Sequence, residues 1–212
     1  MRISILCSNI SHPVYSQIIR WKNVSEHEVS VVSLASQLDE GDLLFLVSCS
    51  EIIASSVASK FKAVLVLHAS DLPRGRGWSP HIWEILNGGD SITLSLIEAI
   101  QPVDSGRIYA QRVIPIAKDA LWDEINCALF ESELALIDDV VSNWGGLIPY
   151  EQSTEVNVTY CRRRGPGDSR VDPNKSIAQQ FNLLRVCDPN RFPAFFELFG
   201  KKYKILLEKV ND

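Results

Sequence analysis

The stretch DLLFLVSCSEIIASSVASKFKAVLVLH, residues 42–68, contains two short apolar runs with a more polar segment between them. Leu43 to Val47 and Ala63 to Leu67 are continuously apolar, which is typical of strands buried on both faces of a parallel sheet. The segment from Ile52 to Phe61 has the composition and length of a helix. The strand, helix, strand order favours a parallel pair of strands covered by a helix.

The same alternation extends toward the N-terminus. Arg2 to Cys7 is apolar, and the polar cluster Ser8 to Pro13 that follows it resembles a helix start. Val29 to Leu34 is a further Val-rich run. We therefore predict an α/β protein with a mainly parallel sheet. The first strand is not followed by G-x-G-x-x-G, so NAD-dependent hydride transfer is not expected.

The C-terminal half has a different pattern. Residues 120–142 predict a long amphipathic helix that ends at the Trp144-Gly145-Gly146 break. The other elements expected here are strands over 92–97, 107–113, 156–160, 194–197 and 202–207, a turn over 165–173 and a helix near 174–186. We expect a domain over residues 1–145 and a small α+β unit over residues 146–212.

Composition limits the class of protein. The 212 residues are 46% hydrophobic and 22% charged, as in soluble globular proteins. No apolar run approaches the roughly 20 residues that span a bilayer, and the start of the chain does not resemble a signal peptide, so a cytoplasmic protein without a membrane partner is expected. The five cysteines and four histidines lack metal-site spacing, and we expect buried thiols and no metal.

Charge is distributed unevenly along the chain. Residues 1–159 hold 10 Lys/Arg and 20 Asp/Glu, whereas residues 160–212 hold 11 and 6. A nucleic-acid partner such as tRNA would need clustered Lys and Arg, so an acidic body argues against one. A small anionic ligand near the basic tail fits this distribution, although ordinary variation of a solvated surface would produce it too.

Polar residues follow two of the predicted strands. Ligands bind at the carboxyl ends of strands in open parallel sheets, which directs attention to Ser48-Cys49-Ser50 and to the loop from His68 to His81. The first group is equally consistent with a helix N-cap. His68, at a strand end beside a loop rich in Gly and Pro, is a candidate general acid or base.

Three blocks of sequence resemble a known family. They are His68-x-Ser70-x-Leu72-Pro73-x-x-Arg76-Gly77-x-x-Pro80, then Trp83-x-Ile85-Leu86-Asn87-Gly88, and Val103-Asp104-x-Gly106-x-Ile108. Together they resemble the formyltransferases that use 10-formyltetrahydrofolate. The tail, with Arg162-Arg163-Arg164 and Phe192-Pro193-Ala194-Phe195, is similar to members that formylate nucleotide-linked amino sugars, and the His68 loop is similar to those of bacterial pseudaminic-type pathways.

The resemblance implies a Rossmann-like N-terminal domain and an Asn, His and Asp active site. It assigns the histidine to His68 and the aspartate to Asp104, where a turn residue is the alternative. The asparagine position, two residues before the histidine, is Val66. A charged His68, Ser70 or a backbone N–H could replace this oxyanion donor, or the chain could be slow or inactive.

The resemblance also implies binding residues. The formyltetrahydrofolate pocket corresponds to Ser50, Ile52, Ile53, Ile100, Gln101 and Asp104. Residues expected near the acceptor are Ser70, Trp78, His81, Arg162 and Arg164, of which Trp78 and His81 could instead pack on the core. Three adjacent arginines on a strand cannot all face one phosphate group.

These residues predict an N-formyltransferase that acts on the primary amine of a nucleotide-linked deoxyamino sugar. Its co-substrate would be 10-formyltetrahydrofolate and its partner a small nucleotide sugar. One alternative is an enzyme similar to methionyl-tRNA formyltransferase, and another is a catalytically impaired protein that binds folate or sugar nucleotides. Purine-pathway formylation fits the sequence less well than either.

Overall fold

A six-stranded sheet in the order β2-β1-β3-β4-β6-β7 forms the centre of the molecule in the computed structural model, which describes residues 1–210. The first four strands in this order run parallel, and β6 and β7 continue the sheet antiparallel. The strands are β1 (Arg2–Leu6), β2 (Glu28–Val32), β3 (Gly41–Leu46), β4 (Phe61–His68), β6 (Ser91–Glu98) and β7 (Ile108–Pro115).

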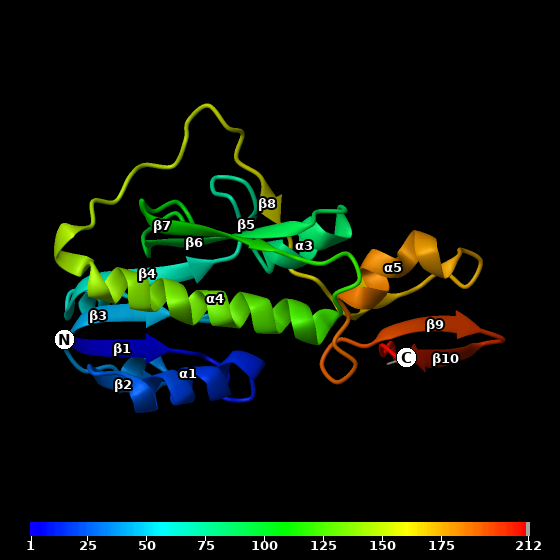
Figure 1. Cartoon of the computed structure of the whole chain (residues 1–212), viewed down its shortest axis with the longest axis horizontal. Coiled ribbons are helices and arrows are strands. Elements are labelled where there is room, and N and C mark those ends of the chain that lie inside the picture. The colour runs from blue at the N-terminus through cyan, green and yellow to red at the C-terminus, as the bar shows by residue number, and fades with distance from the viewer. Residues whose placement is uncertain (211–212) are drawn as a thin grey trace.

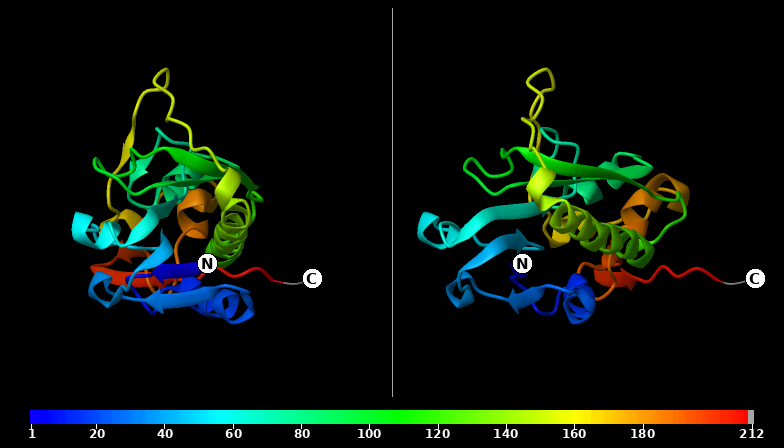
Figure 2. Two further views of the ribbon diagram at one scale, coloured as in Figure 1. Left: turned by 90° about the vertical axis from the view of Figure 1, so that its left-hand side faces the viewer. Right: turned by 60° about the vertical axis from the view of Figure 1, so that its left-hand side comes forward.

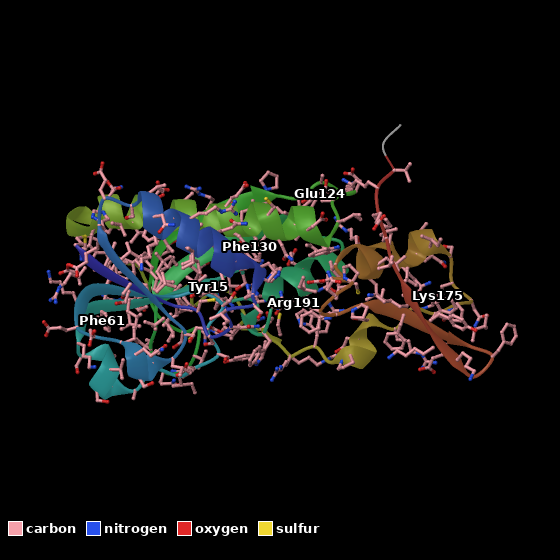
Figure 3. The ribbon with its side chains drawn as sticks, turned by 90° about the horizontal axis from the view of Figure 1, so that it is seen from below. Tyr15, Phe61, Glu124, Phe130, Lys175 and Arg191 are labelled. Atoms are coloured by element: carbon pink, nitrogen blue, oxygen red, sulfur yellow. The ribbon has the colours of Figure 1, made fainter. Side chains whose placement is uncertain are left out.

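Helices and loops cover both faces of this sheet. The α-helices are α1 (Pro13–Val24), α2 (Ser55–Ala58), α3 (Pro80–Leu86), α4 (Trp122–Ser142) and α5 (Ile177–Arg185). Three-residue or four-residue 3₁₀ turns span Ala35–Gln37, Trp144–Gly146 and Pro166–Ser169. Leu43 and Phe45 of β3 pack in the main core with Phe130 of α4 and with Tyr15 of α1 (Figure 3), whereas Leu44 and Leu46 pack in a second cluster on the opposite face. Strand β3 is therefore apolar at successive positions because both of its faces are buried.

The predicted α/β class is confirmed, including the mainly parallel sheet, the long helix and the small C-terminal unit. Helix α4 ends at Ser142, within the range expected from its apolar spacing, and a 3₁₀ turn over Trp144–Gly146 follows it. Within residues 1–210 no helix combines the length and the hydrophobicity needed to cross a membrane.

The helix predicted from Ile52 to Phe61 is wrong. Only the four residues of α2 are helical, and Phe61 already belongs to β4. Serines at positions 55, 56 and 59 offer the backbone competing hydrogen bonds, as Ser59 Oγ does by donating to the carbonyl of Ser56 at 3.2 Å. Ile52 is 73% exposed, so the segment lacks the buried apolar face that stabilises most helices.

The strand predicted over Val156 to Tyr160 is also corrected. The strand here is β8 (Tyr160–Cys161), and it pairs in parallel with β5 (Arg76–Gly77) of the His68 loop. Residues 147–159 form the long connection that projects from the body in Figures 1 and 2. The pairing depends on the edge that the His68 loop offers, which is not encoded in the local apolar pattern.

The C-terminal unit contains α5 and a hairpin of β9 (Ala194–Leu198) and β10 (Lys201–Ile205). It has its own small apolar cluster, which includes Val171, Leu184 and Ala194. The buried Arg185 attaches it to the body by donating from Nη1 to the carbonyl of Ala117 at 2.9 Å. In Figure 1 the arrowheads of β1, β3 and β4 point toward this unit, so it lies beyond the carboxyl edge of the sheet.

The five cysteines are all free. Cys7 and Cys187 are buried and Cys49 and Cys161 half-buried, but Cys127 is exposed on α4, contrary to the expectation of buried thiols. It lies on the polar face of the helix, where its thiol donates to Glu131 one turn later.

Candidate active site

Strand β4 carries His68 to the carboxyl edge of the sheet. Leu65 and Leu67 point into the main core, and Val66 packs on the opposite face with Leu72. His68 is the last residue of the strand and is only 7% exposed. The alternation of the strand therefore buries its apolar residues and leaves one titratable side chain at the end.

Both ring nitrogens of His68 face hydrogen-bond acceptors. Nε2 lies 2.8 Å from the carbonyl oxygen of Gly75, and Nδ1 lies 3.5 Å from Oδ1 of Asp104. A carbonyl oxygen only accepts, so Nε2 is the donor in the first contact. A neutral ring then has no proton for Asp104, whereas a doubly protonated ring satisfies both neighbours. The ring can therefore donate to Asp104 as well as to Gly75 only when it carries both protons.

Asp104 is fixed by its own turn. It has a φ of 60°, in the left-handed region that Asp tolerates better than most residues. Its Oδ2 accepts from the Gly77 N–H at 2.8 Å, which leaves Oδ1 for His68. Gly106 allows this turn to pass close to β6, because a Cβ there would overlap the carbonyl of Glu98. Asp104 is 8% exposed and lies 36 positions after His68 in the chain, so the tertiary fold brings the two residues together.

Positions 66 and 70 bear on how an oxyanion would be held. Val66 is half-buried among apolar residues and offers no hydrogen bond. Ser70 is buried, and its Oγ has no partner among the described residues. The backbone of Ser70 is held firmly, because its carbonyl accepts from Ser95 Oγ at 2.7 Å and its N–H donates to the His68 carbonyl at 3.0 Å. Ser70 Oγ is therefore a free donor beside the loop that holds His68.

The two segments expected to hold folate both adjoin the second apolar cluster. Ile53 in the first segment and Ala99, which directly precedes the second, both pack on this cluster. Ser50, Ile52, Ile100 and Gln101 are exposed around them. These four residues are therefore accessible to solvent, and their part in folate binding stays a prediction.

The residues expected near the acceptor divide into two groups. Trp78 is 46% exposed on the His68 loop, available for a ring ligand. His81 instead lies in the first turn of α3 with its Nδ1 buried and without a partner among residues 1–210. Burial lowers the pKa of His81 to about 4, with smaller contributions from His68 and His12, so the ring is neutral at pH 7.

The tail arginines are already engaged. Arg162 pairs with the carboxylate of Asp168, and Arg164 donates from Nη2 to the Asp168 carbonyl at 2.9 Å. Arg163, which the sequence did not single out, lies with its guanidinium 4.7 Å from the centre of the Trp78 ring. Residues 162–164 follow the end of β8 at Cys161 and belong to no strand, so the expectation of three adjacent arginines on a strand is wrong.

The sequence also missed backbone and polar groups that fix the site. The Gly75 carbonyl and the Gly77 N–H hold His68 and Asp104, and nothing in the identity of a glycine signals such a contact. Gln152 was missed as well, since it follows the long helix in a segment without a recognised motif.

Comparison with known proteins identifies the family of this chain. Residues 4–141 match the model of the formyl transferase family. The chain belongs to this family. A methionyl-tRNA formyltransferase of Lactococcus lactis subsp. cremoris is 25% identical over 187 residues, which are 87% of this chain and 57% of that protein. The chain spans about half the length of the curated relatives it matches.

Solved structures share the fold over nearly the whole chain. Methionyl-tRNA formyltransferase from Clostridium thermocellum has a TM-score of 0.79 at 20% identity and covers 97% of both chains. The N-formyltransferase from Helicobacter canadensis, in complex with folinic acid and dTDP-3-aminofucose, has a TM-score of 0.70 at 14% identity, covering 93% of this chain and 84% of that one. At these identities the likeness establishes the formyltransferase fold.

Proposed function

We propose that this protein transfers a formyl group from 10-formyltetrahydrofolate to the primary amine of a nucleotide-linked deoxyamino sugar. The observation that carries the proposal is the buried His68–Asp104 pair at the carboxyl edge of a formyl transferase fold. The proposal treats residues 1–145 as the catalytic domain and residues 146–212 as the C-terminal unit, and it retains the expected cytoplasmic location.

The His68–Asp104 pair supplies the proton transfers that the reaction requires. The amine nitrogen attacks the formyl carbon, and the carbonyl electron pair moves to oxygen to give a tetrahedral oxyanion. Neutral His68 takes one proton from the attacking nitrogen, and the imidazolium so formed returns one to the folate nitrogen as its bond to carbon breaks. Protons therefore balance over the cycle. That imidazolium and the hydroxyl of Ser70, which has no partner among residues 1–210, are the groups that would hold the oxyanion in place of an asparagine at 66.

We expect formyltetrahydrofolate to bind at the exposed loops of the second face, because Ile53 and Ala99, the residue before Ile100, both pack on the second cluster. The acceptor fits the other side of the His68 loop. There the exposed Trp78 with Arg163 offers an aromatic face and a positive charge, which suit a nucleotide or sugar ring and a phosphate. A pseudaminic-type pathway is the more specific form of this proposal and rests on the wording of the His68 loop.

Methionyl-tRNA formylation is the second candidate, because the curated relatives bear that name. The excess of acidic residues over positions 1–159 favours the nucleotide sugar over tRNA. A protein that binds these ligands without turnover is the third, and Val66 is the residue that favours it. An assay of tetrahydrofolate release with amino-sugar nucleotides and with aminoacylated tRNA as acceptors separates all three.

Substitution of the pair tests the mechanism. We expect His68→Asn to lower turnover by about 10²- to 10⁴-fold, because a general acid and base is lost. Asp104→Asn keeps the turn but removes the negative charge beside His68, so the rate falls and its pH profile shifts. His27→Asn is the matched control, since His27 lies between α1 and β2 outside this edge. Near-wild-type turnover by folded His68→Asn would exclude the proposed role.

A further inference from the structure

A segment beyond the family match lies against both loops of the candidate site. Its two ends are fastened to the body, since Tyr150 pairs with Ile108 through two backbone hydrogen bonds and β8 pairs with β5. Thr159 adds a side-chain contact by accepting from the Gly75 N–H at 2.8 Å. We call residues 150–161 the strap. The family match ends at residue 141, so the strap lies outside it.

Gln152 on the strap uses its whole amide group. Its Oε1 accepts from Nη2 of Arg76 at 2.6 Å. Its Nε2 donates to the carbonyl of Asp104 at 2.8 Å and to that of Gly106 at 2.9 Å. The two N–H groups meet two acceptors and the oxygen meets a donor, so these neighbours determine the orientation of the amide. Gln152 is the one described residue that hydrogen-bonds with its side chain to both site loops.

The partners of Gln152 are neighbours of the groups that hold the catalytic pair. Arg76 lies between Gly75, whose carbonyl contacts His68, and Gly77, whose N–H contacts Asp104. On the other side, Gln152 holds the main chain of Asp104 itself. A shift of either loop would change the 3.5 Å separation of His68 Nδ1 and Asp104 Oδ1. Among residues 1–210 no carboxylate pairs with the Arg76 guanidinium, and the hydrogen-bond partner of that guanidinium is Oε1 of Gln152.

We propose that Gln152 is a positioning residue that joins the Arg76 loop to the Asp104 turn and so sets the geometry of the His68–Asp104 pair. This inference rests on the proposed function for its kinetic consequence. It makes the strap part of the working site, although the residues that touch the reacting atoms lie on the body. Displacement of a catalytic group by about 1 Å costs on the order of 10²-fold in rate.

The test is Gln152→Met, which keeps the length and neutrality of the side chain and removes its three hydrogen bonds. We expect kcat to fall by about 10²-fold with little change in KM for either substrate. Asn157→Met is the matched control, because it is an exposed amide on the same strap. Gln152→Glu is the second variant. It retains an acceptor for Arg76 but loses both donors to the Asp104 turn, so its kcat should fall too.

A readout independent of turnover follows the His68 ring by NMR, with its signals assigned by comparison with His68→Asn. The groups around this ring are the Asp104 carboxylate, the Gly75 carbonyl and the neutral His81. In Gln152→Met we expect the ring signals of His68 to change in chemical shift, because a displaced Asp104 changes the surroundings of Nδ1. A merely structural role would lower the melting temperature and leave these signals in place.

The outcomes separate this inference from the proposed function. Wild-type protein that transfers no formyl group to any acceptor defeats the proposed function, and the chemical shifts of His68 then decide the role of Gln152 alone. Active wild-type protein with unchanged kcat and unchanged His68 ring signals in both folded Gln152 variants overturns the positioning role.

Discussion

The side chain at position 66 bears on whether the active site lacks an oxyanion donor or has other groups in that role. The family resemblance implies an asparagine here, and the structure places a valine among apolar neighbours such as Leu72, Ile97 and Ile108. His68 ends the same strand and Ser70 lies in the loop after it, and the Ser70 hydroxyl, which has no partner among residues 1–210, is the donor that we expect to act in place of the asparagine. A site that already holds its donors gains little from another one.

We therefore expect Val66→Asn to lower stability and to leave turnover nearly unchanged. A buried amide without partners costs about 1 to 3 kcal/mol, which denaturant unfolding measures directly. Val66→Thr is the control, because it keeps the branched shape and adds a smaller polar group. A rise in turnover of about 10²- to 10³-fold in Val66→Asn would show instead that the site lacks an oxyanion donor.

At the scale of elements, α4 carries an unusual buried acid. Glu133 is 7% exposed in the middle of the helix, and its Oε2 has no hydrogen-bond partner among residues 1–210. Burial raises the pKa of Glu133 from 4.5 to about 8, so the side chain is protonated in the folded protein at neutral pH. Helix α4 packs this position toward the sheet, because Phe130 and Ile137 on the same face are buried in the main core.

This acid should make folding stability depend on pH. As pH rises from 4.5 toward 8 the unfolded chain loses the Glu133 proton and the folded chain keeps it, so Glu133 lowers the unfolding free energy by about 1.4 kcal/mol per pH unit. Glu133→Gln should remove this decline, which unfolding curves at several pH values between 5 and 8 would show. Glu131→Gln, on the exposed face of α4, should leave the slope as in wild type. An unaltered slope in Glu133→Gln would mean that the acid is ionised when folded.

At the scale of the whole molecule, the change from acidic to basic sequence coincides with the change from the body to the C-terminal unit. The acidic residues are concentrated before position 160, and the basic tail forms a unit beyond the carboxyl edge where the candidate site lies. Several tail cations are paired within the protein, including Arg162 with Asp168, Arg170 with Glu197 and Lys209 with Glu124. Eight of the eleven Lys and Arg residues after position 159 lie outside these ion pairs, so the case against a long polyanion rests on the acidic excess over positions 1–159.

Binding of the acceptor should therefore depend weakly on salt. Each phosphate contact contributes about 0.7 to 0.9 to the slope of log K against log salt, and a nucleotide diphosphate offers few such contacts. Titration calorimetry with an amino-sugar nucleotide at several salt concentrations measures this slope, and total tRNA is the comparison. Saturable tRNA binding with a steep slope would favour the tRNA substrate.

The sequence by itself determined the elements whose evidence is local. Continuous apolar runs predicted the parallel strands, 3.6-residue spacing predicted α4, and the residues after the apolar run over 63–67 placed His68 at a strand end. Family motifs implied Asp104 as its neighbour. Each of these signals lies within one short segment, where burial on one or both faces leaves a regular pattern of apolar residues.

The tertiary structure decided what depends on partners far apart in the chain. The helix expected at 52–61 shrank to four residues because its serines compete with helical hydrogen bonds and Ile52 has no surface to pack on. Arg162 met Asp168, and Gln152 met Arg76 and the Asp104 turn across 76 and 48 positions. A single polar side chain or a backbone carbonyl in a loop has no periodicity. Its role is set by the groups that folding brings within hydrogen-bond distance.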